Sequence, residues 1–470
     1  MIRSFKMNVP SQRGGYAPLF LLSYLITMKK VFLISLGCSK NHVDSEVILG
    51  LLANDGFEPT PSLDEADVVI INTCAFIQEA VQESIEAIVE VAQAKEKGTG
   101  NKLIVTGCLP QRYGEELARE IPEVDLWIGT GEFPRIPQLL KDDKTKVLIG
   151  TPRYLYDHHT PRLITNTPHS AYVKIAEGCS HPCTFCLIPR LRGRYRSRQM
   201  NSVIREVEHL VARGIVEINL VAQDTTAYGA DIREERGLYR LLKELIKIRG
   251  LRWIRVLYSY PHPIHSHPSF LEMVAGEEKI CPYLDIPIQH IDAKILQRMG
   301  RSFSEKETRA LINYIKKDYP AIHLRTTLMV GFPGEGEREF RRLLDFVRGV
   351  KFTHLGVFTY SPEEGTKAAR MKGRISSEMA EERASQIMGL QQGISRKRNK
   401  EMIGSVVPVL IDGIGVGPEG VLQGRAPFQA PEVDGIVHIK KGTAKIGEIV
   451  RVKITQAEPY DLVGEIEGRS

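Results

Sequence analysis

Apolar residues in the first third of the chain gather into short continuous runs that each end in a cysteine. The runs VFLISLGC, DVVIINTC and KLIVTGC end at Cys38, Cys74 and Cys108, at intervals of 36 and 34 residues. Runs of this kind are typical of buried strands in a parallel sheet, and helical periodicity fills the intervals at 44–53 and 77–95. The pattern predicts a parallel α/β domain over residues 28–150.

A second series of apolar runs follows, with helical segments between its members. The runs cover residues 171–176, 216–222, 253–259, 283–288, 324–330 and 355–359, and the helical segments include 202–213, 238–248, 305–317 and 337–348. Six strand–helix units in this length predict a partial (β/α)6 barrel within residues 165–395, rather than a complete eight-fold barrel.

The last part of the chain has a different hydrophobic pattern. A charged helical stretch covers residues 376–402, and short apolar segments punctuated by glycine follow it. Such spacing predicts a small β-barrel of the OB-like kind over residues 403–470.

Composition excludes several classes of protein. Hydrophobic residues make up 42% and charged residues 26% of the 470 residues, so the chain is neither disordered nor fibrous. Residues 1–27 are cationic and then apolar, but Ser23 and Tyr24 interrupt the apolar part and no small-residue cleavage site follows. We expect a disordered extension rather than a signal peptide, and no membrane span.

The number and distribution of the cysteines indicate which role the thiols have. There are seven, an odd number spread through a long chain, which favours reduced thiols in a cytoplasmic protein over a disulfide framework. Six fall into two groups of three, and we expect the seventh, Cys281, to be a core residue.

Cys38, Cys74 and Cys108 all follow strands. Ligands of open α/β sheets bind at the carboxyl ends of the strands. Each of these cysteines could simply be a small buried side chain. Because the same position recurs on successive strands, we expect them to bind a metal or an iron–sulfur cluster.

The second group is Cys179, Cys183 and Cys186, directly after the first strand of the predicted barrel. A zinc knuckle would need a fourth ligand, for which His181 is the nearest candidate. Three cysteines on a 4Fe-4S cluster would instead leave one iron open to a small molecule. The spacing, with Phe185 inside it, is similar to that of the radical S-adenosylmethionine (SAM) superfamily.

A basic run follows the second group. It contains Arg190, Arg192, Arg194, Arg196 and Arg198 with no acidic residue between them. The run is compatible with a solvated loop, or with contact to a polyanion, an acidic part of a substrate or a cofactor carboxylate.

Together the two groups and the β-rich tail resemble the methylthiotransferase family of radical-SAM enzymes over nearly all of residues 28–468. The segments GCSKNHVDSE (37–46), NTCAFI (72–77), GCLPQRY (107–113), AQDTTAYG (222–229), IPIQH (286–290) and MVGFPGE (329–335) resemble its RimO branch, which modifies ribosomal protein uS12. His42 stands where that branch has leucine, and Ala222 where it often has serine.

This resemblance implies two 4Fe-4S clusters. Cys38, Cys74 and Cys108 would hold an auxiliary cluster, and Cys179, Cys183 and Cys186 the cluster that binds SAM. Phe185, Gln223 and Gln289 are candidate SAM contacts, and each could equally be an ordinary polar or apolar group at a strand end. The fold would combine a flavodoxin-like domain, the partial barrel and a TRAM domain.

The implied reaction replaces a β C–H bond of a conserved aspartate of uS12 with a methylthio group. An unactivated C–H bond requires a radical cofactor, here SAM on the open cluster, with an electron donor such as flavodoxin. The alternative is the same chemistry on a tRNA adenosine, as in the MiaB type, and a third is a non-catalytic RNA-binding or assembly protein. The TRAM domain implies contact with RNA, but residues 405–470 hold seven Lys or Arg against nine Asp or Glu, which suits a basic protein partner better.

Overall fold

The computed structural model describes residues 28–95, 101–142, 144–165, 167–261, 268–415 and 420–468. The predicted extension at 1–27 lies outside these ranges. The described residues form two compact units: one comprises residues 28–165 together with 188–194, and the other comprises 167–187 and 195–468. The predicted domain ranges of 28–150, 165–395 and 403–470 stay a prediction.

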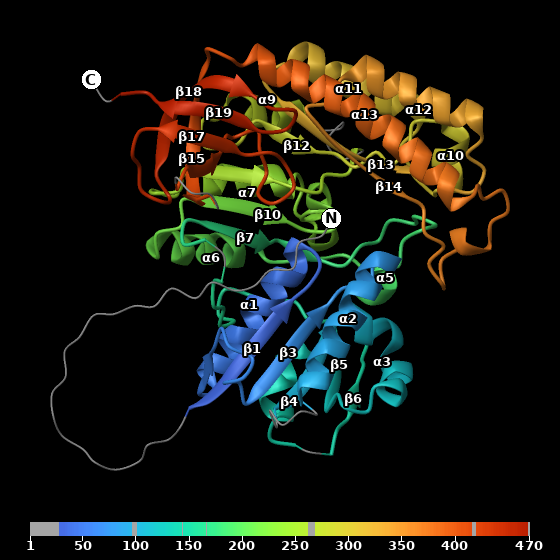
Figure 1. The fold of residues 1–470 in the computed structure, drawn as a ribbon, viewed down its shortest axis with the longest axis vertical. Helices are drawn as coiled ribbons and strands as arrows, with labels where there is room; N and C mark the ends of the chain where they lie inside the picture. Colours follow the sequence, from blue (N-terminus) through green and yellow to red (C-terminus); the bar gives the residue numbers. More distant parts are fainter. Residues whose placement is uncertain are drawn as a thin grey trace. The chain divides into compact units, whose positions relative to one another are not determined.

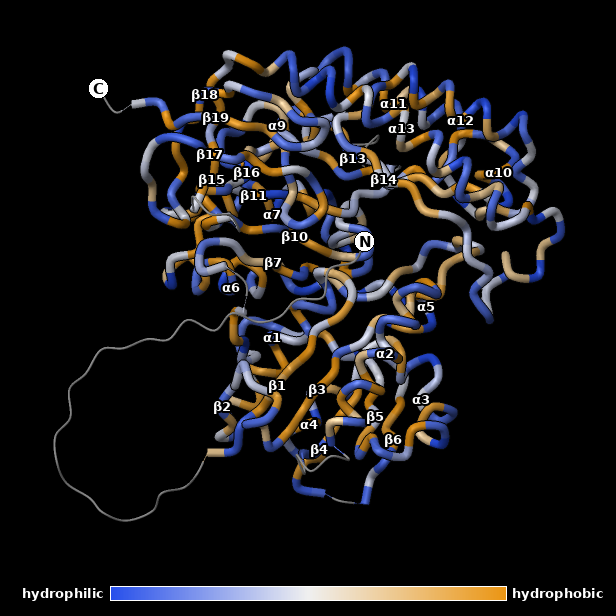
Figure 2. The backbone as a smooth tube through the Cα atoms, viewed as in Figure 1, coloured by the Kyte–Doolittle hydropathy of each residue, from blue (hydrophilic) through white to orange (hydrophobic). Residues whose placement is uncertain are grey.

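The first unit contains a parallel six-stranded sheet in the order β2-β1-β3-β4-β5-β6 (Figure 1). Its strands are β1 (Lys29–Ser35), β2 (Phe57–Pro59), β3 (Val68–Thr73), β4 (Lys102–Gly107), β5 (Leu126–Gly129) and β6 (Val147–Leu148). This order is that of flavodoxin-like folds, and it confirms the predicted class. Every residue of β3 is buried, and the apolar strands stand out in Figure 2.

Helices connect these strands. They are α1 (Ser39–Asn54), α2 (Gln78–Ala94), α3 (Cys108–Glu120) and α4 (Ile136–Leu139). The sheet order reverses between β1 and β3, which is the topological switch point where doubly wound sheets bind ligands.

The second unit contains the predicted half-barrel. Two parallel three-stranded sheets, β11-β10-β7 and β12-β13-β14, are joined where Ile254 bridges to Ile280. Its strands are β7 (Ser170–Lys174), β10 (Glu217–Val221), β11 (Trp253–Val256), β12 (Tyr283–Asp285), β13 (His323–Val330) and β14 (His354–Thr359). The six strands fall where the apolar runs predicted them.

Helices of this unit alternate with the strands. They are α6 (Met200–Ala212), α7 (Gly237–Leu245), α9 (Pro268–Gly276), α10 (Ala293–Arg298), α11 (Glu305–Asp318), α12 (Glu337–Val350) and α13 (Ser377–Glu401). The short strands β8 (Ala176–Glu177) and β9 (Arg196–Ser197) pair with each other and flank the second cysteine group. Helix α5 (Ile188–Leu191) lies between them in sequence, within residues 188–194, which belong to the first unit.

A closed five-stranded barrel ends the second unit, as predicted. Its strands, in the order β15-β16-β17-β19-β18, are β15 (Val406–Ile414), β16 (Leu422–Arg425), β17 (Val437–Lys441), β18 (Ile449–Ala457) and β19 (Leu462–Ile466). Buried side chains such as Val409, Ile439 and Val452 fill its interior.

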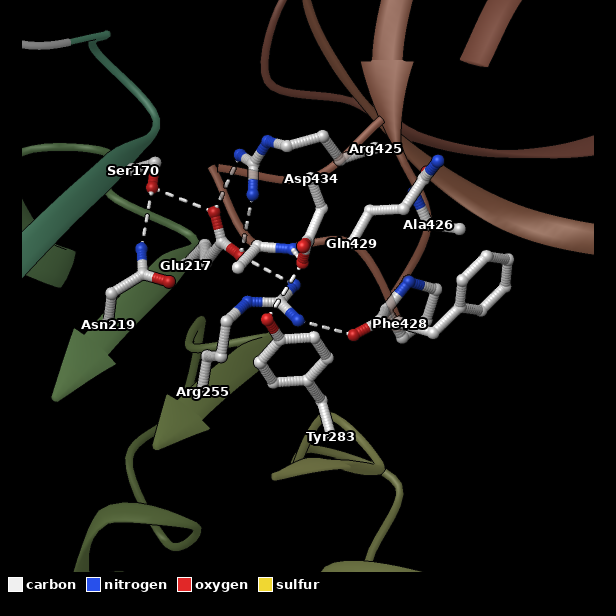
Figure 3. A network of polar contacts seen from close by, with 12 residues as sticks. Ser170, Glu217, Asn219, Arg255, Tyr283, Arg425, Ala426, Phe428, Gln429 and Asp434 are labelled. Carbon is white, nitrogen blue, oxygen red and sulfur yellow. Dashed lines mark hydrogen bonds and ion pairs between the residues drawn. The ribbon is translucent and has the colours of Figure 1, made fainter. Parts of the chain in front are cut away.

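A buried ion network fastens this small barrel to the half-barrel within the second unit (Figure 3). Glu217, at the start of β10, accepts hydrogen bonds from Arg425 at 2.8 Å and Ser170 at 2.7 Å, and Arg255 lies 3.2 Å from the same carboxylate. Asp412 forms a second ion pair with Arg425 at 2.7 Å. Because Glu217 and Arg255 are fully buried, each charge depends on its partners.

Candidate active site

The first cysteine group occupies the carboxyl end of the sheet in the first unit. Cys38 caps α1 directly after β1, Cys74 follows β3, and Cys108 is the first residue of α3 directly after β4. The register pairs β1 with β3 and β3 with β4, so the three cysteines follow three adjacent parallel strands. The sequence prediction that the three cysteines lie at the carboxyl ends of parallel strands is confirmed.

The glycine before two of these cysteines allows neighbouring strand ends to approach each other closely. Gly37 and Gly107 have φ of +96° and +102°, a region that residues with a Cβ rarely adopt. A Cβ on Gly37 would lie 2.7 Å from the Cys74 Cβ, and one on Gly107 would lie 2.5 Å from the Thr73 carbonyl oxygen. The two Gly–Cys pairs therefore bring neighbouring strand ends together.

Asn41 connects the strand ends through hydrogen bonds. Its Nδ2 donates to the carbonyl oxygens of Leu36 at 2.7 Å and Thr73 at 2.9 Å, and its backbone carbonyl oxygen accepts from Asn72 Nδ2 at 2.9 Å. Asn41 and Asn72 are each 1% exposed. A buried amide with its polar atoms satisfied in this way fixes the geometry of the turn that carries Cys38.

Arg192 completes the network from a distant part of the sequence. Its guanidinium donates to Asn41 Oδ1 at 2.5 Å and Asp44 Oδ2 at 2.9 Å, and the side chain is 3% exposed. Arg192 belongs to the basic run, and residues 188–194 pack with the first unit. Thus at Arg192 the run is neither a solvated loop nor a polyanion patch.

The three thiols have different electrostatic surroundings. Burial opposes ionisation of Cys38, but the charges of Lys40 and Arg192 and nearby backbone N–H groups outweigh it, so its pKa falls below the ordinary value. Burial, together with the neighbouring thiols, raises the pKa of Cys74 well above its ordinary range. Burial also raises the pKa of Cys108, against the charge of Arg192 and a hydrogen bond from it.

The chemistry of this donor set fits a 4Fe-4S cluster. All seven cysteines lie in the described part of the chain, and none is in a disulfide. Within the described ranges, no three His, Cys, Asp or Glu side chains gather closely enough for one metal ion. Cysteines of a 4Fe-4S cluster bind separate irons, so their sulfur atoms need not converge on one point.

The second cysteine group lies in a loop of the second unit that follows β8 and is held from two sides. Thr184 donates its backbone N–H to Met299 O at 2.9 Å and its hydroxyl to Arg298 O at 2.8 Å. The Thr184 carbonyl accepts from Ala368 N at 2.9 Å. Burial raises the pKa of Cys179 to about 11, although the backbone N–H of His181 favours its thiolate.

Arg301 reaches this loop. Its Nη1 lies 3.8 Å from Cys183 Sγ, and its Nη2 donates to Pro287 O at 2.7 Å. The guanidinium also lies 4.3 Å from the centre of the Tyr260 ring. Arg301 thus connects the turn of Cys183 to the segment at Pro287 and to Tyr260.

His181, the candidate fourth ligand of a zinc knuckle, is committed to other partners. Its Nε2 lies 2.7 Å from Asp224 Oδ2, and its ring stacks on Tyr260 at 3.9 Å. The ring is therefore held by Asp224 and Tyr260, which makes it a support for the loop.

The three candidate SAM contacts lie at the carboxyl-end side of the half-barrel. Phe185 packs edge-to-face on Phe332 at 6.3 Å, beside an apolar cluster that includes Met299 and Ala368. Gln223 follows β10. Gln289 has φ of +70°, and its buried Oε1 has no hydrogen-bond partner among the described residues. A strained residue with an unsatisfied buried oxygen is typical of a ligand site.

Two sequence motifs meet in this unit. His290, from IPIQH, has its Nε2 3.5 Å from Glu335 Oε2, from MVGFPGE, and both are fully buried. Glu335 also accepts from Gly331 N at 3.1 Å and Arg383 Nη1 at 2.6 Å. The pairing ties the segment after β12 to the loop after β13.

Sequence reasoning missed Arg301 and Asn41 as site residues, and it did not distinguish Arg192 from the rest of the basic run. Asn41 and Asp44 are three apart in GCSKNHVDSE, in the first turns of helix α1, which Cys38 caps. This spacing puts both on one face, so a buried partner could have been sought. Nothing in the local sequence distinguishes Arg192 from its neighbours, since its role depends on tertiary packing.

Three family models match successive parts of the chain. They are described as uncharacterized protein family UPF0004 (residues 30–129), the radical SAM superfamily (173–347) and the TRAM domain (403–466). With the geometry above, they define a class: radical-SAM enzymes with a cysteine-bearing amino-terminal domain and a TRAM barrel.

Curated relatives define the family within this class. The chain is 47% identical over 446 residues to ribosomal protein uS12 methylthiotransferase RimO of Pelobacter propionicus, covering 94% of this chain and 99% of that protein. It is 48% identical over 442 residues to RimO of Geobacter sulfurreducens, covering 93% and 98%. The chain belongs to the RimO family of ribosomal protein uS12 methylthiotransferases.

Solved structures support the fold alone. The radical SAM methyltransferase TsrM of Kitasatospora setae aligns with a TM-score of 0.53 at 16% identity, over 70% of this chain and 72% of that one. The cobalamin-dependent radical SAM enzyme OxsB aligns with a TM-score of 0.51 at 12% identity, over 77% and 56%.

Proposed function

We propose that this chain replaces a β C–H bond of a conserved aspartate of ribosomal protein uS12 with a methylthio group. The observation that carries the proposal is similarity along the whole chain to relatives named for that activity, at 47% identity over 94% of the chain. The enzyme class follows from the family. The aspartate and its β-carbon are the proposed part.

Cys38, Cys74 and Cys108 are proposed to hold the auxiliary 4Fe-4S cluster, and Cys179, Cys183 and Cys186 the cluster that binds SAM. Two observations support this assignment. Each group supplies three cysteines within one compact unit, and an arginine supports each group: Arg192 through its hydrogen bond to Asn41, and Arg301 at 3.8 Å from Cys183 Sγ. Three protein ligands leave one iron of each cluster open.

When bound, the two clusters and SAM supply the one-electron chemistry, the sulfur and the methyl group that no side chain can provide. The protein's own part is to hold and orient them. Thr184 anchors the second loop to Met299 and Arg298, and the Asn41 network anchors the first group to two strand ends.

Phe185, Gln223 and Gln289 are proposed as SAM contacts. The unpartnered Gln289 Oε1 is an acceptor suited to an amino or hydroxyl group of SAM. Phe185 lies beside an apolar cluster that would exclude water from the loop.

Partners and location follow from the proposed substrate. uS12 is cytoplasmic, so we place the enzyme there, and among the described residues no helix is long and apolar enough to cross a membrane. A small electron-transfer protein such as flavodoxin is the proposed reductant, and the TRAM barrel is proposed to contact uS12 or the RNA around it.

Mass spectrometry tests the substrate. Purified enzyme is incubated anaerobically with SAM, a sulfide source, dithionite, and either uS12 or bulk tRNA. We expect uS12 to gain the mass of one methylthio group less one hydrogen at a single aspartate, with release of 5′-deoxyadenosine. Modification of a tRNA nucleoside with unmodified uS12 would overturn the proposal. Absence of 5′-deoxyadenosine would instead indicate a non-catalytic protein.

A further inference from the structure

Arg192 is placed by a short stretch of chain that joins the two cysteine groups in sequence. Cys186, the last cysteine of the second group, is followed six residues later by Arg192, and residues 188–194 pack with the first unit. In α5 the Leu191 carbonyl accepts a hydrogen bond from Thr130 Oγ1 at 2.5 Å, which fixes the backbone next to Arg192.

The Arg192 guanidinium is a buried charge. Arg192 is 3% and Asp44 is 4% exposed. A buried ion pair costs several kcal/mol of desolvation per ion, and apolar residues of similar volume often stabilise as well or better. Stability alone therefore does not explain a charge at this place.

The groups around Arg192 indicate its role. Asp44 accepts from the guanidinium at 2.9 Å. Asn41, which also accepts from it at 2.5 Å, donates in turn to the carbonyl oxygens of Leu36 and Thr73, at the strand ends that carry Cys38 and Cys74. Three thiolates around iron and sulfide create an anionic centre whose charge grows on reduction. A fixed cation that lies one side chain away from these strand ends stabilises the reduced form of such a centre more than the oxidised form.

We propose that Arg192 is a positioning residue that raises the reduction potential of the auxiliary cluster and that Asp44 moderates its effect. The inference rests on the proposed function only in assigning a cluster to Cys38, Cys74 and Cys108. It predicts that two neighbouring substitutions change the reduction potential in opposite directions. Removing the Arg192 charge makes reduction of the cluster harder, and removing the Asp44 charge makes it easier.

The test uses the full chain carrying Cys179→Ala, Cys183→Ala and Cys186→Ala, so that only the auxiliary site can hold a cluster. The cluster is titrated with dithionite, and its reduced state is followed by electron paramagnetic resonance. In this background we expect Arg192→Gln to shift the reduction equilibrium at least tenfold toward the oxidised form, which is about 59 mV for one electron. Asp44→Asn should shift it the other way.

Arg190→Gln is the matched control, because Arg190 is exposed in the same basic segment. It should leave the potential unchanged. If Arg192→Gln assembles no cluster, Arg192→Lys keeps the charge and should restore both the cluster and a potential close to the parent's.

Three results would overturn the inference: an unchanged potential in Arg192→Gln, a shift of the same sign in Arg192→Gln and Asp44→Asn, or loss of the cluster in both Arg192 variants. A parent without any cluster would instead refute the auxiliary-site assignment, so the two failures are distinguishable. Circular dichroism of each variant confirms that the fold is intact.

Discussion

Single residues determine the geometry of the first cysteine group. Gly37 and Gly107 adopt backbone conformations that favour glycine, and each precedes a cysteine at a strand end. The sequence pattern of an apolar run, a small residue and a cysteine could therefore be interpreted correctly from local chemistry. Arg192 could not, because its partners Asn41 and Asp44 are about 150 positions away.

The two groups should fail in different ways when one cysteine is removed. We expect Cys183→Ala to abolish SAM cleavage, because it removes a ligand of the cluster that binds SAM. Cys74→Ala should leave cleavage partly intact and stop sulfur insertion. The measurement is 5′-deoxyadenosine and methylthiolated uS12 from the same reaction.

Cys281→Ala is the control for that pair, because Cys281 is a buried core residue, 2% exposed, as the sequence predicted. It should retain both products. Equal loss of both products in Cys183→Ala and Cys74→Ala would contradict the division of labour.

At the scale of elements, long apolar strands were predicted best. The six half-barrel strands are continuous apolar runs and were found from that pattern, whereas the short strands β5 and β6 and helix α3 were not anticipated. Helix α3 begins at Cys108 and buries only its first turn and Gly114. Its largely polar sequence therefore offers few apolar positions from which a helix could be predicted.

Helix α1 depends on a glycine that no local pattern explains. The segment after β6 crosses α1, where Glu46 forms an ion pair with Arg162 at 2.5 Å and accepts from Thr165 N at 2.8 Å. A Cβ on Gly50 would lie 2.5 Å from the Pro161 carbonyl carbon and oxygen. The helix and the crossing segment can approach this closely only at a glycine.

Gly50→Ala should therefore destabilise the protein by about 1–3 kcal/mol through overpacking, despite the better helix propensity of alanine. Urea unfolding measures the change. Gly389→Ala in α13 is the control, because a Cβ there meets nothing within 4 Å, and it should be neutral or stabilising by up to about 1 kcal/mol. Equal stability changes in the two variants would contradict the contact.

At the scale of the whole molecule, the ion network at Glu217 couples the small barrel to the half-barrel. Burial raises the pKa of the Glu217 carboxyl, but the charges of Arg425 and Arg255 outweigh it and bring the pKa to about 2. A depressed pKa contributes stability above the ordinary value of 4.5, and this contribution is lost as pH falls from there toward 2. Acid should thus weaken the attachment of the small barrel.

Arg425→Met should cost about 3–5 kcal/mol at pH 7, because it leaves the buried Glu217 carboxylate with Arg255 as its one remaining arginine and breaks the ion pair with Asp412. Thermal or urea unfolding measures the loss. Arg451→Met is the control in the same barrel, since Arg451 is 73% exposed and should change stability by no more than about 0.5 kcal/mol.

Glu217→Gln provides the pH test. Its stability should fall less steeply than that of the unaltered protein between pH 4.5 and 2, because the titrating group is gone. A parallel pH dependence in the two proteins would show that the Glu217 network does not control acid stability.

The fold class and both cysteine groups could be predicted from the sequence, because strands, spacing and thiols are local features. The Glu217 network could not, since it joins residues more than 200 positions apart. Nor could the burial of Arg192 and Arg198, whose charges suggested a solvated or anion-binding run but whose side chains are 3% and 1% exposed.

The most direct test of the central claim, that two separate cysteine triads each hold a 4Fe-4S cluster, is the iron and sulfide content per chain after anaerobic purification and reconstitution. The unaltered protein should contain the iron and sulfide of two 4Fe-4S clusters per chain. A variant lacking Cys38, Cys74 and Cys108, and one lacking Cys179, Cys183 and Cys186, should each contain one. A full content in either variant, or a single cluster in the unaltered protein, would contradict the account.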